Sequence, residues 1–274
     1  MIRINKTANP PARLTDHGAT QTATDIAEYL ADPALYTNQV RRQPKKTFLR
    51  RIYGCITVKD QLKVDQHHKC CYCESKFTAN SPGDVEHYRP KARIKIPGNR
   101  GFQKPGYYWL VYEWENLFFS CEKCNRTNKG DKFPLLNETK RATPHDNPNT
   151  IGDESPLLIC PTENPSNHIE FDKDTIKGKD IRGEKSIEYY GLKRPELLDK
   201  RRAKFQSLLN SQRISRNPNT VTQQVVDSYN AAFATNYTIQ DIKDIVTIEN
   251  NELSYAISDE GEFSLMARTN FTAP

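Results

Sequence analysis

The sequence predicts an α+β protein whose centre is stabilised by metal and whose two ends are mainly helical. Two Cys-x-x-Cys pairs lie in the middle of the chain, with 47 residues between them. Residues 67–135 hold both tryptophans and five of the seven cysteines. Helical patterns lie on either side of this region, and the runs HIEF and TIKG that follow it are typical of short strands.

The amino-terminal part predicts two helices. The first begins at Thr22 or Thr24, either of which is able to cap it, and continues through TDIAEYLAD. The second covers about residues 48–66, although Gly54 lies inside it and weakens the pattern. The aromatic segment YYWLVYEWENLFF, further along, is compatible with helix or strand.

The carboxy-terminal part predicts two more helices. One runs from Ile187 and is entered through Pro195, and the next covers roughly Val221 to Ala234. Residues 238–266 are ambiguous. We therefore divide the chain into four regions: an amino-terminal helical region, 1–64; a zinc-knuckle domain, 65–135; a loop-rich extension with short strands, 136–192; and a mainly helical region, 193–274.

Composition indicates several small layers and long polar connections. Of the 274 residues, 36% are hydrophobic, and the mean hydropathy is -0.80. No apolar run approaches the roughly 18 residues of a membrane span, so we expect no membrane association. The first residues contain no apolar signal-peptide core, which predicts a cytoplasmic protein with reduced thiols.

The charge distribution suggests a polyanionic partner. The net charge is +6 and the sequence pI is about 8.8. Residues 41–51 hold six cations and no acid, residues 89–104 hold a second acid-free basic run, and Lys200-Arg201-Arg202 with Lys204 forms a third cluster. A basic run is usually a solvated face, but three such runs favour nucleic acid as the partner.

The two Cys-x-x-Cys pairs predict a structural zinc site. A two-residue gap lets two thiolates turn onto one ion, and two such knuckles complete the tetrahedral sulfur set that Zn²⁺ prefers. The predicted ligands are Cys70, Cys73, Cys121 and Cys124. Redox-active dithiols and buried core cysteines are the alternatives. Redox chemistry needs one Cys-x-x-Cys motif on a thioredoxin-like unit, which two facing pairs fit poorly.

The stretch GDVEHYRPK, residues 83–91, lies between the two knuckles. It places the carboxylates of Asp84 and Glu86 beside His87 and is followed by cations. Asn116 comes 29 residues after His87, and Asn125 comes directly behind the second knuckle. A histidine beside a glutamate is weak evidence alone, but together with both knuckles this constellation is specific.

In these residues the chain resembles the HNH endonucleases. Their ββα-metal motif reads Asp/Glu-x-Asp/Glu-His-x-x-Pro, then Asn-Leu, then Cys-x-x-Cys followed by Asn or His. DVEHYRP, ENLFFSC and CEKCN match it in order. The resemblance implies a small ββα-metal (HNH) centre with a Cys₄ zinc site, flanked by the amino- and carboxy-terminal helical regions.

The resemblance is closer to the HNH subunit, PtuB-like, of Septu-type antiphage defence systems, which is sometimes found in retron operons. It covers roughly residues 65–195, including KCCYCES, the aromatic segment, KGDKFPL, NPSNHIEF and IEYYGLKR. It implies an ATPase partner of the ABC/SMC-like class, with a retron reverse transcriptase and its nucleic acid as a further partner. We expect residues 1–64 and 196–274 to carry the docking to the ATPase.

The resemblance also implies roles for individual residues. His87 is the general base for attack of water on phosphorus, since the unperturbed imidazole pKa is about 6.5. Mg²⁺ or Mn²⁺ binds Glu86 and Asn125, while Asn116 orients His87 or its loop. Asp84 supports the metal site or forms a turn. Arg89, Lys91 and Lys129 are expected to meet phosphates of the nucleic acid.

Two departures from the family pattern are visible. Glu86 stands where many HNH enzymes have aspartate, which lengthens the arm by one methylene. The family commonly reads Cys-Asn-x-x-Lys-Gly, whereas this chain has one residue more, so that Asn125 and Asn128 both compete as ligand. The nine-residue step from Asn116 favours Asn125.

Two other classes of function remain open from the sequence. In the first, the chain is a non-catalytic, zinc-stabilised nucleic-acid-binding module; in the second, it is an adaptor or regulatory subunit whose basic faces bind a partner or a guide-like nucleic acid. The presence of acid, histidine and both asparagines together argues against the first, and the basic run 41–51 supports the second. DNA and RNA substrates are not distinguished by any base-reading element in the sequence.

Overall fold

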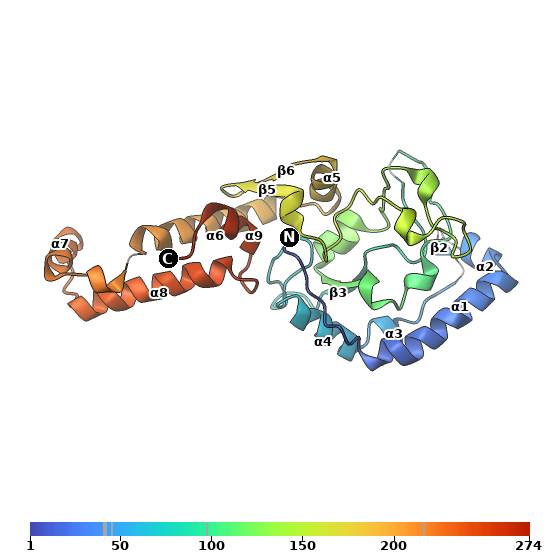
Figure 1. Cartoon of the computed structure of the whole chain (residues 1–274), viewed down its shortest axis with the longest axis horizontal. Helices are drawn as coiled ribbons and strands as arrows, with labels where there is room; N and C mark the ends of the chain where they lie inside the picture. Colours follow the sequence, from blue (N-terminus) through green and yellow to red (C-terminus); the bar gives the residue numbers. More distant parts are fainter. Residues whose placement is uncertain (41–42, 45, 97, 216) are drawn as a thin grey trace. The chain divides into compact units, whose positions relative to one another are not determined.

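The computed structural model is an α+β protein, as predicted (Figure 1). It describes residues 1–40, 43, 44, 46–96, 98–215 and 217–274. The chain divides into two compact units, the first made of Met1–Ile169 with Lys177–Lys193 and the second of Glu170–Ile176 with Arg194–Pro274. Residues 1–64 therefore belong to the same unit as the two cysteine knuckles.

In its described residues, the amino-terminal part of the first unit contains four α-helices and one short strand pair. The helices are α1 (Ala19–Ala31), α2 (Ala34–Thr37), α3 (Arg50–Tyr53) and α4 (Ile56–Asp65). Between α2 and α3, β1 (Gln39–Val40) pairs antiparallel with β2 (Gln43–Pro44).

Both predicted amino-terminal helices are present, with different bounds. A π-helical turn, Leu14–Gly18, continues directly into α1, so the helix begins before the predicted threonine caps. The second predicted helix is interrupted after Tyr53, where Gly54 and the extended Cys55 separate α3 from α4. The glycine noted in the sequence is the point at which the helix ends.

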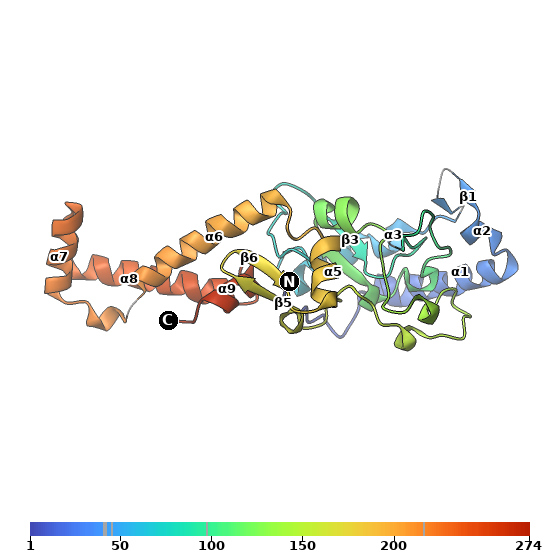
Figure 2. The ribbon, with the colours of Figure 1, turned by 90° about the horizontal axis from the view of Figure 1, so that it is seen from above.

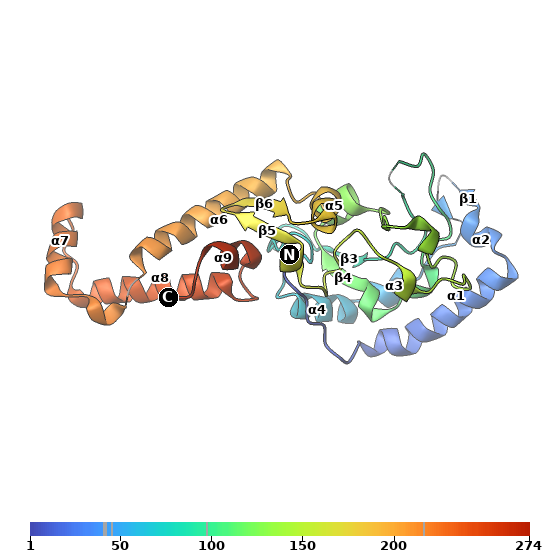
Figure 3. The same cartoon turned by 45° about the horizontal axis from the view of Figure 1, so that its top comes forward.

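The centre of the first unit is a two-stranded antiparallel sheet. Strand β3 (Asp84–His87) pairs with β4 (Leu117–Ser120), and His87 lies opposite Leu117. A π-helical segment, Lys123–Lys129, follows β4. Figure 3 shows β3 and β4 side by side, with α4 next to β4.

The aromatic segment before β4 is neither one helix nor one strand. It forms two short 3₁₀ turns and then enters β4. Six of its aromatic side chains are buried, namely Tyr107, Tyr108, Tyr112, Trp114, Phe118 and Phe119. They belong to the core around the small sheet, so core packing and not base stacking is their role in this structure.

The strand runs HIEF and TIKG form a second two-stranded sheet, β5 (Ile169–Asp172) with β6 (Thr175–Gly178). Helix α5 (Ile181–Tyr189) follows, capped by Asp180, whose carboxylate accepts from Gly183 N at 2.8 Å. The single helix predicted from Ile187 is therefore two, because the chain leaves helical geometry after Tyr189 and re-enters it at Pro195.

The second unit is mainly helical and contains α6 (Pro195–Ile214), α7 (Gln223–Phe233), α8 (Ile239–Ile257) and α9 (Ser264–Asn270). Helix α6 packs along α8, with α7 at the far end of the pair (Figure 2). The stretch left ambiguous by the sequence, 238–266, contains α8, a turn and the start of α9, and Thr238 and Asp241 form a capping box at the start of α8.

The basic runs read from the sequence differ in their surroundings. Arg201 is buried, and its guanidinium lies 5.2 Å from the ring centre of Phe171 and 5.7 Å from that of Phe263, so the third cluster is not a uniformly solvated face. Arg41, Arg42 and Lys45 of the first run lie outside the described residues.

Among the helices of the described part, none has the length and apolarity to cross a bilayer.

Candidate metal centre and active site

The four cysteines of the two knuckles converge on one point. Cys70 and Cys73 lie in the turn after α4, and Cys121 and Cys124 follow β4. Their four sulfur atoms all lie within 4.8 Å of one another, and all four side chains are buried. The Cys73 and Cys121 sulfurs are 3.9 Å apart. The predicted convergence of these cysteines is confirmed.

This cluster has the chemistry of a metal site. Four buried sulfur donors in a closed shell match the ligand number and softness that a tetrahedral ion such as zinc requires. Without an ion, burial raises the pKa of the Cys70 thiol well above its usual value. A bound cation reverses that preference because it binds the thiolate form, so metal binding and folding are coupled here.

The cluster is tied to the sheet by backbone hydrogen bonds. Cys71 N donates to Phe119 O of β4 at 3.0 Å. The Gln66 side chain pairs with the same residue: it donates to Phe119 O at 2.7 Å and accepts from Phe119 N at 2.8 Å. Gln66 thus acts as a substitute strand partner for β4, a role that sequence reasoning did not identify.

Removing the metal should destabilise the first unit. Incubation of the purified chain with a strong zinc chelator is expected to lower the thermal midpoint by well over 5 °C, since structural zinc contributes folding free energy directly. Metal content by mass spectrometry and the melting curve measure this together. The matched control is Cys55→Ser, outside the cluster, which should keep one metal per chain, whereas Cys73→Ser should lose it. An unchanged melt after metal removal would contradict a structural role.

Glu86 is held in a buried ion pair. Its carboxylate lies 2.7 Å from the ammonium of Lys129, and the Tyr72 hydroxyl donates to it at 3.4 Å. Lys129 is fully buried and also donates to the backbone oxygen of His87 at 2.9 Å. In this structure Lys129 neutralises Glu86 and holds the end of β3, and protein encloses its ammonium, so its predicted contact with a phosphate stays a prediction.

His87 is buried at the end of β3, and its two neighbours define its tautomer. Its Nε2 lies 3.0 Å from Val111 O, and its Nδ1 lies 3.4 Å from the ammonium of Lys91. A carbonyl only accepts and an ammonium only donates, so Nε2 carries the hydrogen and Nδ1 keeps its lone pair. Burial, followed by the charge of Lys91, holds the pKa of His87 well below its usual value, which keeps the imidazole neutral.

Asn116 connects the loops on either side of His87. Its side-chain oxygen accepts from Arg89 N at 2.7 Å, and its amide donates to Arg89 O at 3.1 Å and to Leu110 O at 3.0 Å. Leu110 directly precedes Val111, whose carbonyl meets the imidazole. Asn116 therefore sets the position of the loop that orients His87, which is the kind of role expected from the sequence.

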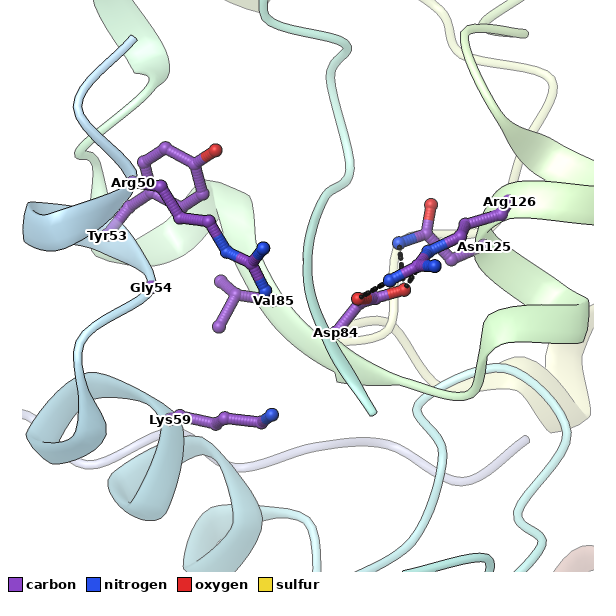
Figure 4. A pocket seen from close by; sticks show the side chains of 8 residues that line it. All are labelled: Arg50, Tyr53, Gly54, Lys59, Asp84, Val85, Asn125 and Arg126. Atoms are coloured by element: carbon purple, nitrogen blue, oxygen red, sulfur yellow. Dashed lines mark hydrogen bonds and ion pairs between the residues drawn. The ribbon is translucent and has the colours of Figure 1, made fainter. Parts of the chain in front are cut away.

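A cavity of about 170 Å³ lies beside β3 (Figure 4). It is lined by Arg50, Tyr53, Gly54, Lys59, Asp84, Val85, Asn125 and Arg126. Asp84 is paired with Arg126 at 2.7 Å, and the Asn125 amide donates to the Asp84 carboxylate at 3.4 Å. Asn128 instead donates to Lys123 O at 2.6 Å. Of the two competing asparagines, Asn125 is the one beside a carboxylate.

The Asn125 amide contacts the carboxylate of Asp84. Glu86, which is predicted to bind metal together with Asn125, is paired with Lys129 instead. Asp84 and Glu86 are two residues apart on β3, so they share one face of the strand. Asp84 reaches the cavity, while Glu86 reaches Lys129. The Asp-x-Glu spacing already marked Asp84 as a candidate in the sequence, where its role was either support of the metal site or formation of a turn.

The remaining predicted phosphate contacts also have protein partners. Arg89 is paired with the buried Glu154 at 3.0 Å, and Lys91 is half-buried beside His87 and over the ring of Tyr53. The cations that line the cavity come from elsewhere, namely Arg50, Lys59 and Arg126. Sequence reasoning counted Arg50 in a basic run but gave it no place in the site.

Breaking the Glu86–Lys129 pair should destabilise the protein strongly. Lys129→Met is expected to cost about 3–5 kcal/mol of unfolding free energy, because it leaves a buried carboxylate without its cation. Urea denaturation measures this. The double variant Glu86→Gln with Lys129→Met should recover most of the loss. If Lys129→Met unfolds like the wild type and only weakens nucleic-acid binding, Lys129 is a surface contact instead.

Comparison with known proteins agrees with the motifs. No protein-family model matches the chain. Over 154 residues it is 45% identical to the Septu protein PtuB of Bacillus mycoides (strain KBAB4), an alignment that covers 54% of this chain and 51% of that protein.

The chain is similar to Septu protein PtuB. A second Septu protein PtuB, from Bacillus thuringiensis, is 28% identical over 141 residues, or 50% of this chain and 41% of that protein. The chain spans about half the length of the curated relatives it matches. The predicted resemblance to the Septu subunit is confirmed over this half, while the resemblance to HNH endonucleases in general rests on the motifs.

Proposed function

We propose that the protein is a metal-dependent HNH endonuclease that hydrolyses phosphodiester bonds of nucleic acid, DNA or RNA including tRNA. The observation that carries the proposal is His87: its Nε2 meets a backbone carbonyl, which leaves Nδ1 unprotonated at neutral pH. A cavity lined by Tyr53, whose ring packs on His87, combines a carboxylate, an amide and three cations. A neutral imidazole connected in this way to a cationic pocket with oxygen ligands supports the proposal that water attacks a phosphodiester here.

In this proposal each group has one role. Nδ1 of His87 takes the proton of the attacking water, and Asn116 keeps the loop that orients the imidazole in place. Mg²⁺ or Mn²⁺, bound by Asn125 and a carboxylate of β3, supplies stabilisation of the charge at phosphorus and on the leaving oxygen. The four cysteines hold Zn²⁺, which is structural because the sulfur shell has no open position.

The Septu resemblance extends the proposal to a biological role. The relatives are named Septu proteins, and we propose that this chain is likewise a subunit, the nuclease effector, of an antiphage defence system. An ATPase of the ABC/SMC-like class is the proposed partner, and a retron reverse transcriptase with its nucleic acid is a further one.

A non-catalytic nucleic-acid-binding or adaptor subunit is the second candidate, and one observation favours it. Both carboxylates of β3 are already paired with cations, Glu86 with Lys129 and Asp84 with Arg126. A divalent ion has to displace one of these cations before it binds. The alternative holds if no ion does so.

Cleavage should depend on His87 and on a divalent metal. Purified wild type, zinc-loaded and combined with its ATPase partner, is expected to cut labelled duplex DNA, single-stranded DNA or tRNA only with Mg²⁺ or Mn²⁺. His87→Ala should lower the rate by about 10²–10⁴, the usual contribution of a general base, while zinc content stays the same. Gel assays with EDTA controls measure this. Equal cutting by both proteins would refute the assignment of His87.

Two further variants in the same assay identify the carboxylate ligand. Asp84→Asn should raise the Mn²⁺ concentration needed for half-maximal cutting if the cavity holds the ion. Glu86→Gln should do so if the family motif gives the ligand. Binding of nucleic acid by all variants without any cutting under every metal condition would favour the non-catalytic alternative.

The second unit is the better candidate for ATPase docking, because residues 1–64 help to build the first unit and its cavity. Near the end of α7, Phe233 is 65% exposed and lies beside Tyr229, with ring centres 4.7 Å apart. Phe233→Ser is expected to weaken the ATPase complex at least about tenfold, as loss of an aromatic anchor does. The matched control is Leu30→Ser on α1, also exposed. Analytical ultracentrifugation measures the affinity of both variants for the ATPase. A larger loss in Leu30→Ser than in Phe233→Ser would assign the docking to the amino-terminal helices instead.

A further inference from the structure

One wall of the cavity beside β3 comes from a segment that the metal and histidine motifs do not include. Helix α3 contributes Arg50 and Tyr53, and the turn and helix after it contribute Gly54 and Lys59. In Figure 4 the side chains of Arg50 and Lys59 lie across the cavity from Asp84, Asn125 and Arg126. The amino-terminal segment is therefore part of the site.

The charges that line this cavity favour an anion. Three cations and one carboxylate line it, namely Arg50, Lys59 and Arg126 against Asp84. Arg126 and Asp84 pair with each other at 2.7 Å. The charges of Arg50 and Lys59 remain without a carboxylate among the lining residues, so the cavity has an excess of positive charge on its amino-terminal wall.

The two cations of this wall are available in different ways. Arg50 is exposed, and across the described residues its guanidinium enters no hydrogen bond or ion pair. Lys59 is half-buried and donates to Gly83 O at 2.8 Å, which leaves further N–H groups for a ligand. Burial, followed by the charge of Lys63, lowers the pKa of Lys59, and an anion beside the ammonium would favour its charged form.

The backbone places the Arg50 side chain over the turn between α3 and α4. A Cβ at Gly54 would lie 2.9 Å from both the Arg50 oxygen and Arg50 Cγ, so glycine permits this close approach. Tyr53, in the same turn, also meets the candidate base: its ring centre lies 4.7 Å from that of His87, in an edge-to-face arrangement. An anion held by Arg50 is thus next to the residue that packs on His87.

We infer that Arg50 and Lys59 form a phosphate subsite that binds the nucleic-acid backbone beside the scissile phosphodiester. The inference rests on the proposed nuclease function and adds its substrate contacts. The arginine supplies a planar fork for two phosphate oxygens, and the lysine supplies a compact charge from the other helix. Arg50 is the residue on which the test depends, because Lys59 also supports Gly83.

The experiment compares two neighbouring arginines of α3 in the full chain. Arg50 lines this cavity, whereas Arg51, also exposed, lines a different one with Arg13 and Ile52. Arg50→Ala and Arg51→Ala remove the same charge from adjacent positions. Binding of a fluorescein-labelled single strand and of a labelled duplex is measured by anisotropy over a series of salt concentrations without added Mg²⁺, and melting curves verify the fold of each variant.

Arg50→Ala should weaken binding about tenfold, the loss expected for one charge-assisted contact. It should also reduce the slope of log affinity against log salt by about 0.7–0.9, the contribution of one phosphate contact. Arg51→Ala should change affinity less than about twofold, and Arg50→Lys should restore the slope but not the full affinity.

Equal losses in Arg50→Ala and Arg51→Ala would refute the subsite, because the effect would then be general electrostatics. Failure of the wild type to bind either oligonucleotide would also refute it. The readout is independent of cleavage. If Arg50→Ala weakens binding as expected while His87→Ala leaves cleavage unchanged, the phosphate subsite stands and the proposed role of His87 fails.

Discussion

Convergence of the four cysteines is the constraint on which the rest of the first unit depends. The two knuckles lie before β3 and after β4, so a metal ion held between them would join segments about fifty residues apart and close the intervening chain into a loop. The sheet has only two short strands, which are marginal by themselves. Cys71 and Gln66 then attach β4 to the same knuckle through Phe119. A metal ion bound by the four sulfurs would cross-link the frame of the candidate site.

The two acids of β3 differ in how deeply their cationic partners are buried. Glu86 and Lys129 are both enclosed, so separating them leaves a buried charge without its partner, which is costly. Asp84 has a partner, Arg126, whose side chain is 58% exposed. Water can replace the protein contacts of such an arginine at little cost. A divalent ion at this site, as proposed above, would displace Arg126 from Asp84 more readily than Lys129 from Glu86, which favours Asp84 as its carboxylate ligand beside Asn125.

Short spacings predicted the parts of this site that are local, and the rest depends on contacts distant in sequence. The Cys-x-x-Cys pairs, the acid-histidine run and Asn125 behind the second knuckle are all encoded within a few residues. Lys129 pairs with Glu86 across more than forty residues, and no pattern distinguishes it from a surface lysine. The same holds for Arg50, whose basic run looks solvated until Gly54 ends α3 beside β3. The α+β class followed from strong patterns, whereas the helix breaks at Gly54 and after Tyr189 reflect local backbone geometry.

Tertiary structure also determines which atom of His87 is able to act as a base. The imidazole contacts a carbonyl on one side and an ammonium on the other, so both neighbours select the same tautomer without help from a metal ion. The carbonyl belongs to Val111, inside the aromatic segment, and Asn116 holds the preceding residue. The aromatic segment therefore has a second consequence besides filling the core: it contains the carbonyl that leaves Nδ1 of His87 unprotonated and facing Lys91. The protonation state of His87 therefore depends on how the aromatic segment around Val111 packs.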